Sequence, residues 1–357
     1  MSDREKAGLR GPVRICIEET TYGARKHTVA IEYTVDGKLL SSRTDTSDDS
    51  HWATAYTFSP DGRLTVRVSG NLGEPGLESL YSYDDSGRLL TITNNLRKGD
   101  RIDFHCDAQG RKTTIQTFAS ESLQSKQNAA FSGSPWDAAQ IGFGVPLGGS
   151  VTTIYDQNDQ PTEAQILDAQ GQIVSRIFRT YGVNGQLSEE KPTFENLAPA
   201  LLERIPAEQR DQVSPEQIKA MSKVMASMMA GKVPAGTTYT YDPQNRLTNT
   251  RERNMMFEKS TTITYNEQGD KAEEHTTFTE NSVVPVGVPL SVDEEGNLTP
   301  SGSAAQTPPP PIPFPEASVT RYEYQYDSYG NWAQQIASDA AHPSQPPTVR
   351  NRTLTYY

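Results

Sequence analysis

Long apolar runs are missing from this chain of 357 residues. No stretch approaches the ~20 apolar residues of a membrane helix, so we expect no membrane span. Hydrophobic residues make up 34% of the chain, below the ~45–50% typical of globular proteins with glycine included. Half-buried strands with polar outer faces fit this composition better than a thick core. The net charge of −12 argues against nucleic acid as a partner.

Residues that build catalytic and metal centres are scarce. The chain has 5 histidines and 2 cysteines, and no histidine is spaced from another histidine or a cysteine as metal ligands are. His105 and Cys106 are adjacent, so on a strand they point to opposite faces and form no nucleophilic pair. We expect no catalytic residue, no metal site and no cofactor. A bridge between Cys16 and Cys106 is one alternative, and two free buried thiols are the favoured one.

The first residues, MSDREKAGLRGPVRICIEE, contain no apolar signal region. Two alternatives stay open: a cytoplasmic protein, or an exported one whose leader lies outside this sequence.

What the chain does contain is a repeat. Two copies read YTFSPDGRLTVRV at 56–68 and YSYDDSGRLLTI at 81–92. Most copies place an aromatic residue four positions before a turn residue and an apolar residue two positions after it; Cys106, Leu167 and Val292 replace the aromatic residue, and Lys112, Pro161 and Lys271 the apolar one. The turn residues of the eleven copies are Gly37, Gly62, Gly87, Gly110, Asp159, Gly171, Gly185, Asn245, Gly269, Gly296 and Gly330.

This repeat predicts β-hairpins. Asp at the start of a type I turn accepts a backbone hydrogen bond, and glycine then supplies the left-handed residue of a common hairpin loop. Tyr81 and Tyr83 are two apart and share one strand face. The spacing of 25 residues from Gly37 to Gly62, and again to Gly87, equals two strands and two connections. We predict a mainly β fold: a long, twisted antiparallel meander, open or coiled, with a two-helix insertion.

Copies of the form YxYDxxGRL resemble the YD repeats of the RHS family, which occur in bacterial surface and polymorphic-toxin proteins and in animal teneurins. The resemblance covers about 31–118, 151–190, 237–280 and 320–357, and YEYQYDSYGNW at 322–332 is similar to the ends of small bacterial members. It implies a β-sheet wound into a spiral or shell, and it favours export. With eleven copies at most and no DPxG-type segment, a small repeat protein is expected, not a toxin-enclosing shell.

The aromatic residues at the repeat position form what we call the aromatic column. They are expected either to pack as a buried layer of the sheet or to expose rings that stack on sugars. Under the second alternative the ligand-binding candidates are Tyr33, Phe58, Tyr83, Tyr241, Tyr265, Tyr326 and, after the last turn, Trp332.

Three segments interrupt the repeats. Residues 119–150 are expected to be a flexible loop, and 281–319 a Pro-rich loop containing PPPPIPFP. Residues 192–236 are expected to be the helical insertion, because Ser214-Pro215-Glu216-Gln217 forms a capping box. Its apolar stripe packs on the chain's own sheet or forms a partner surface. The partner-binding candidates on that stripe are Met221, Met225 and Met228.

The expected organisation is therefore an N-terminal repeat sheet at 1–118, repeat hairpins at 151–191 and a C-terminal repeat sheet at 237–357. The expected function is a non-enzymatic structural or adhesive repeat protein of the bacterial envelope, in the periplasm or at the cell surface, with glycans or another envelope protein as partners. The alternatives are a carbohydrate-binding module and a cargo-enclosing or chaperone-like fragment. Because long sheets have edges that invite pairing, dimers are compatible with this organisation.

Overall fold

The computed structural model describes residues 1–47, 50–74, 76–94, 101–118, 149–195, 235–253, 257–280, 290–292, 298–300 and 316–357. Within these ranges nearly all regular structure is strand, and α1 (Asp3–Lys6) is their one helix. The pairings between described strands are antiparallel. The mainly β, antiparallel prediction is therefore confirmed. The chain divides into two compact units.

Unit 1 comprises Met1–Lys98, Thr262–His275 and Ser318–Tyr357. Its strands pair in the order β20-β21-β22-β1-β2-β3-β4-β5-β6-β7. Their bounds are β1 (Val13–Tyr22), β2 (Arg25–Tyr33), β3 (Leu39–Thr46), β4 (His51–Phe58), β5 (Leu64–Asn71), β6 (Leu77–Tyr83), β7 (Leu89–Asn94), β20 (Ser318–Tyr326), β21 (Trp332–Asp339) and β22 (Thr348–Tyr356).

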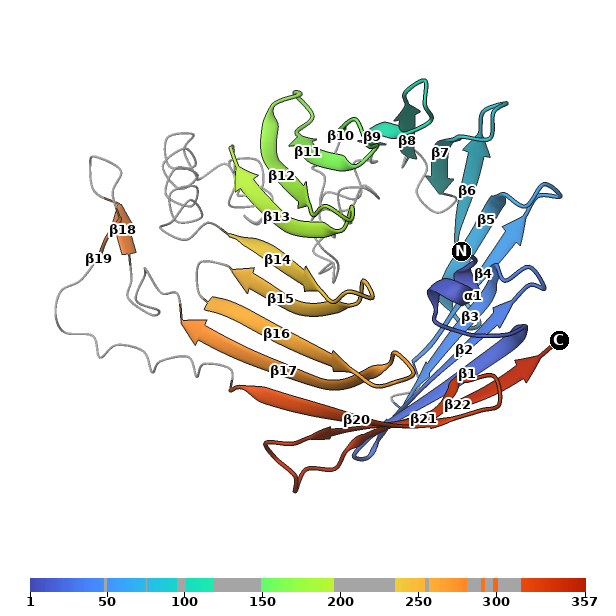
Figure 1. Ribbon diagram of the computed structural model, residues 1–357. Coiled ribbons are helices and arrows are strands. Elements are labelled where there is room, and N and C mark those ends of the chain that lie inside the picture. The colour runs from blue at the N-terminus through green and yellow to red at the C-terminus, as the bar shows by residue number, and fades with distance from the viewer. Residues whose placement is uncertain are drawn as a thin grey trace. The chain divides into compact units, whose positions relative to one another are not determined.

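The two ends of the chain pair with each other inside this unit. Strand β22 lies along β1, with Cys16 opposite Leu354 and Glu18 opposite Arg352; Figure 1 shows the red C-terminal strand beside the blue N-terminal ones. The prediction of an open meander, in which the first and last strands are free edges, is therefore wrong where β1 pairs with β22. Strand β1 is hydrogen-bonded along both edges, to β2 and to β22.

Unit 2 comprises Gly99–Thr261 and Thr276–Ala317. Its strands pair in the order β8-β9-β10-β11-β12-β13-β14-β15. Their bounds are β8 (Arg101–Cys106), β9 (Lys112–Phe118), β10 (Ser150–Tyr155), β11 (Pro161–Leu167), β12 (Ile173–Tyr181), β13 (Leu187–Phe194), β14 (Gly236–Tyr241) and β15 (Leu247–Arg253). The hairpin of β16 (Phe257–Tyr265) and β17 (Lys271–Glu280) contributes its tip to unit 1. A separate hairpin pairs β18 (Leu290–Val292) with β19 (Leu298–Pro300).

The predicted turns are confirmed at every described repeat copy. In the turn around Gly87, the Gly87 amide donates to the Asp84 carbonyl and the Asp84 amide to the Arg88 carbonyl, each at 2.9 Å. Gly87 has φ +84°, and Asp159 and Asn245 hold the same place at +62° and +65°. The ladder register shifts where each such loop closes, for example between Ser82 and Tyr83 in β6. A type I turn followed by a left-handed residue produces this bulge.

Each unit has its own small apolar cluster. In unit 2, Val151, Ala164 and Ile177 come from the neighbouring strands β10, β11 and β12 and are almost completely buried. In unit 1, Cys16 and Tyr33 pack with Leu9 and Val13 of the N-terminal segment. The scarcity of apolar residues is thus matched by small clusters of three or four buried side chains.

The helical insertion was expected at 192–236, and nearly all of this segment lies outside the described residues. At its two edges the structure shows strand instead: residues 192–194 end β13, and Gly236 begins β14. The loop at 119–150 also lies almost wholly outside them. Within the expected Pro-rich loop at 281–319, the described parts are the β18–β19 hairpin around the Gly296 repeat copy and the start of β20.

Candidate functional site

Three of the described repeat turns are closed by an Asp–Arg ion pair, at Asp84–Arg88, Asp107–Arg111 and Asp242–Arg246. In the turn at Asp84, the Arg88 amide donates to Oδ1 at 2.8 Å and the Arg88 Nε to Oδ2 at 2.7 Å. These bonds, first the amide and then the guanidinium, hold the pKa of the Asp84 carboxyl below its usual range. The Asp242–Arg246 turn repeats the arrangement at 2.9 and 2.8 Å. The repeated Asp and Arg residues therefore fold their own loop.

The aromatic column connects one hairpin to the one before it. The Tyr83 hydroxyl donates to the Leu64 carbonyl at 2.7 Å, and the Arg63 guanidinium lies 5.8 Å from the centre of the Tyr83 ring. In unit 2 the Tyr155 hydroxyl donates to the Lys112 carbonyl at 2.8 Å. The hydroxyls of Tyr83 and Tyr155 are therefore engaged in hydrogen bonds to backbone carbonyls, and the ring face of Tyr83 is in contact with a cation.

The seven predicted ligand-binding residues do not share one environment. Tyr33 is 2% exposed, whereas Phe58, Tyr83, Tyr241, Tyr265, Tyr326 and Trp332 are half-buried. Cations lie over some of the half-buried rings, with Lys38 Nζ 5.5 Å from the Phe58 centre and the Arg352 guanidinium 3.4 Å from the Trp332 centre. A ligand role for these rings stays a prediction. The partner candidates Met221, Met225 and Met228 lie outside the described residues.

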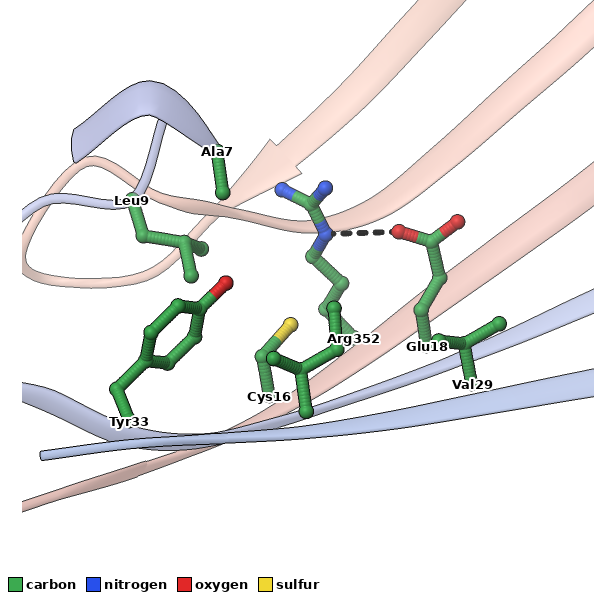
Figure 2. Close-up of a pocket in the computed structure, with 8 residues that line it drawn as sticks. Ala7, Leu9, Cys16, Glu18, Val29, Tyr33 and Arg352 are labelled. Carbon is green, nitrogen blue, oxygen red and sulfur yellow. Dashed lines mark hydrogen bonds and ion pairs between the residues drawn. The ribbon is translucent and has the colours of Figure 1, made fainter. Parts of the chain in front are cut away.

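A pocket of about 240 Å³ lies between α1 and the sheet of unit 1. We call it the α1 pocket (Figure 2). Its floor is formed by side chains on one face of β1, β2 and β22, because Cys16 lies opposite Ile31 and Glu18 opposite Val29. Its cover is Ala7 and Leu9 from the segment after α1. The lining residues are Ala7, Leu9, Cys16, Glu18, Val29, Ile31, Tyr33 and Arg352.

The cover is held to the sheet by hydrogen bonds to turns. Helix α1 begins with a capping box between Ser2 and Glu5. The Arg4 amide then donates to the Gly37 carbonyl and the Leu39 amide to the Asp3 carboxylate, both at 3.0 Å. The N-terminal segment is therefore bound to the first repeat turn.

One wall of the α1 pocket is charged and the rest is apolar. The Arg352 Nε donates to the Glu18 carboxylate at 3.1 Å, and both side chains are mostly buried. Burial raises the pKa of the Tyr33 hydroxyl to about 12 and also raises the pKa of the Cys16 thiol. Both groups therefore stay protonated and neutral near pH 7. The Cys16 thiol is free, as is that of Cys106.

Of the pocket residues, the sequence analysis singled out Tyr33 as a binding candidate and Cys16 as a buried thiol. It missed Glu18 and Arg352, which are more than 300 positions apart in the chain and become neighbours only through the β1–β22 pairing. The helix before the cover could have been predicted from the sequence, since Ser2-Asp3-Arg4-Glu5 is a capping-box sequence.

Two searches within the described ranges were negative. No helix there has the length and apolarity to cross a membrane, and no group of three or more metal-ligating side chains is found there.

No family model matches the chain, and no curated protein matches its sequence. Among solved structures, TcdB2-TccC3 is 13% identical with a TM-score of 0.35, covering 92% of this chain. A porin-like protein from Bacteroides uniformis is 12% identical with a TM-score of 0.32, covering 97% of this chain and 98% of that one. This chain spans only 17% of the TcdB2-TccC3 chain. These TM-scores are too low to carry an argument, so the YD-repeat family stays a resemblance.

Proposed function

We propose that the protein is a non-enzymatic structural or adhesive repeat protein of the bacterial envelope. The observation that supports the proposal is the use of the repeat residues: in three turns the Asp carboxylate binds the Arg of its own loop, and Tyr83 binds the hairpin before its own. Residues engaged in this way build a scaffold and leave few groups for chemistry. The envelope location rests on the resemblance to YD-repeat proteins.

The scaffold role predicts that the column hydroxyls stabilise neighbouring hairpins. Tyr83→Phe removes only the hydroxyl that donates to the Leu64 carbonyl. We expect a loss of about 0.5–1.5 kcal/mol, the net value of one such bond. The loss should show as faster amide hydrogen exchange in β5 and β6. Tyr81→Phe is the matched control, since the Tyr81 hydroxyl has no hydrogen-bonding partner among the described residues. Equal effects of the two substitutions would contradict the scaffold role.

The location is tested separately. Intact cells of the native host are treated with a protease, and the released peptides are identified by mass spectrometry, with a cytoplasmic protein as the control. Release of peptides from this chain, or its recovery in the periplasmic fraction, supports the envelope proposal. Recovery in the cytoplasmic fraction alone would overturn it.

The carbohydrate-binding alternative needs open ring faces. Three observations favour the scaffold over it: Tyr33 is buried, Lys38 lies over Phe58, and Arg352 lies over Trp332. Glycan-array binding that Trp332→Ala abolishes, in a variant that stays folded, would reverse this preference. The cargo-enclosing alternative places the partner on the Met-rich stripe or in a concavity of the sheet, and the segment that carries the stripe, 192–236, lies mostly outside the described residues.

A further inference from the structure

We propose that the α1 pocket binds a small monocarboxylate with an apolar body, its carboxylate on Arg352 and its body between the α1 cover and the sheet. The Arg88–Asp84 and Tyr83–Leu64 bonds that support the scaffold role lie outside this site, so its failure would leave that role standing.

The size of the α1 pocket suits a small molecule. Its volume is about 240 Å³, whereas an apolar cavity of ~150 Å³ already takes benzene. Leu9, Val29 and Ile31 provide apolar walls from the cover and from β2. An eight-carbon acyl chain or a single aromatic ring would replace water against these walls, which is the main source of affinity in such sites.

The Arg352 guanidinium provides the charge that selects a carboxylate. Its Nε is bound to Glu18, and neither terminal nitrogen has a hydrogen-bonding partner among the described residues. In Figure 2 one of these two nitrogens points toward Ala7, and the guanidinium lies between Glu18 and the cover residues. The guanidinium therefore stands between the cover and the Glu18 carboxylate. Arginine has five N–H donors and can hold two carboxylates at once.

The Tyr33 hydroxyl provides a second polar contact. Tyr33 is 2% exposed, and its hydroxyl has no hydrogen-bonding partner in the described part of the chain. Figure 2 shows this hydroxyl directed into the pocket, near Leu9 and above Cys16. Because this hydroxyl faces the pocket and makes no hydrogen bond to the described residues, it can donate to a polar ligand atom or to a water there. We assign it the second oxygen of the carboxylate or a bridging water.

The test is isothermal titration calorimetry of the full chain with octanoate, beside the uncharged 1-octanol. We expect saturable binding of octanoate and at least about tenfold weaker binding of 1-octanol, because a hydrogen bond to a charged group is worth about that factor. Ala7→Phe places a ring at the mouth of the pocket and should weaken octanoate by about tenfold or more, since it fills the space that the ligand needs. Val35→Phe is the matched control: it adds a ring at a residue that is 71% exposed and does not line the pocket, so it should bind like the wild type.

Two further variants test the polar contacts. Arg352→Gln should reduce the affinity for octanoate to that for 1-octanol. Tyr33→Phe should weaken octanoate by about fivefold if the hydroxyl acts through a bridging water, and by more if it donates directly to the carboxylate. If Arg352→Gln does not fold, the Ala7 and Tyr33 variants still decide the matter. Octanoate should also slow alkylation of the Cys16 thiol, which lines the pocket, without changing that of Cys106.

Three results would overturn the proposal: no saturable octanoate binding by folded wild-type protein, equal binding of 1-octanol, or octanoate binding that Ala7→Phe leaves unchanged.

Discussion

Replacing a turn glycine by alanine isolates the conformational reason for the repeat. At Gly269, φ is +89° and an added Cβ would have nothing within 4 Å. The loss of stability in Gly269→Ala therefore comes from the backbone conformation alone. A left-handed L-residue costs roughly 1–2 kcal/mol, of which about 0.4–1 kcal/mol is returned because alanine restricts the unfolded chain. We expect a net loss of about 1 kcal/mol.

The assay for Gly269→Ala is native-state hydrogen exchange. The Gly269 amide donates to the Asn266 carbonyl at 3.1 Å and the Asn266 amide to the Asp270 carbonyl at 2.9 Å, so both report opening of this turn. A loss of 1 kcal/mol corresponds to about fivefold faster exchange of these amides. Asn245→Gly is the control, because Asn already tolerates the left-handed region, and it should stay within about 0.5 kcal/mol of the wild type.

Gly330→Ala should cost more than Gly269→Ala. Its Cβ would lie 2.7 Å from Arg10 Nη1, and the Arg10 guanidinium donates to the carbonyls of Gly330 and Gln268, each at 3.1 Å. Displacing these bonds adds about 1 kcal/mol to the conformational cost. Unchanged exchange in Gly269→Ala would refute the reasoning that φ alone selects glycine at this position. Equal costs at the two glycines would refute the added contribution of Arg10 at Gly330.

Three further predictions concern the core, pH and a thiol. Ile177→Ala should cost about 2–5 kcal/mol and Ile177→Val about 0.5–1.5, because Ile177 is 1% exposed; equal shifts in the urea midpoints would contradict this. The lowered pKa of Asp84 means that its bonds to Arg88 stabilise the fold above the unfolded pKa of ~3.9. That contribution is lost as pH falls through the folded value, so the midpoint difference from Asp84→Asn should shrink below about pH 4; a difference that is constant with pH would refute it. Because burial raises the pKa of Cys16, iodoacetamide at pH 8 should label it more slowly than Cys106, and mass spectrometry of both peptides checks this; faster labelling of Cys16 would refute it.

The local structure of this chain could be predicted from its sequence because it depends on neighbours within a few positions. The left-handed conformation at Gly87 and at Asn245 follows from the residue types that tolerate it. The bond from Arg88 to Asp84 spans four positions, and the same residue pair makes it in the turns at Asp107–Arg111 and Asp242–Arg246. Strand alternation follows from the pleat. None of these features requires knowledge of what packs elsewhere.

The tertiary structure determines the α1 pocket and how far each aromatic ring is buried. Tyr33 and Phe58 occupy the same repeat position, yet Tyr33 is buried because the N-terminal segment covers it, while Phe58 lies under Lys38 and stays half-exposed. Glu18 and Arg352 meet because β22 pairs with β1. A repeat presents the same edges and the same rings many times over, so its local pattern cannot specify which strand pairs with which, or which ring is covered. Those choices depend on the free energy of long-range contacts between the two ends of the chain.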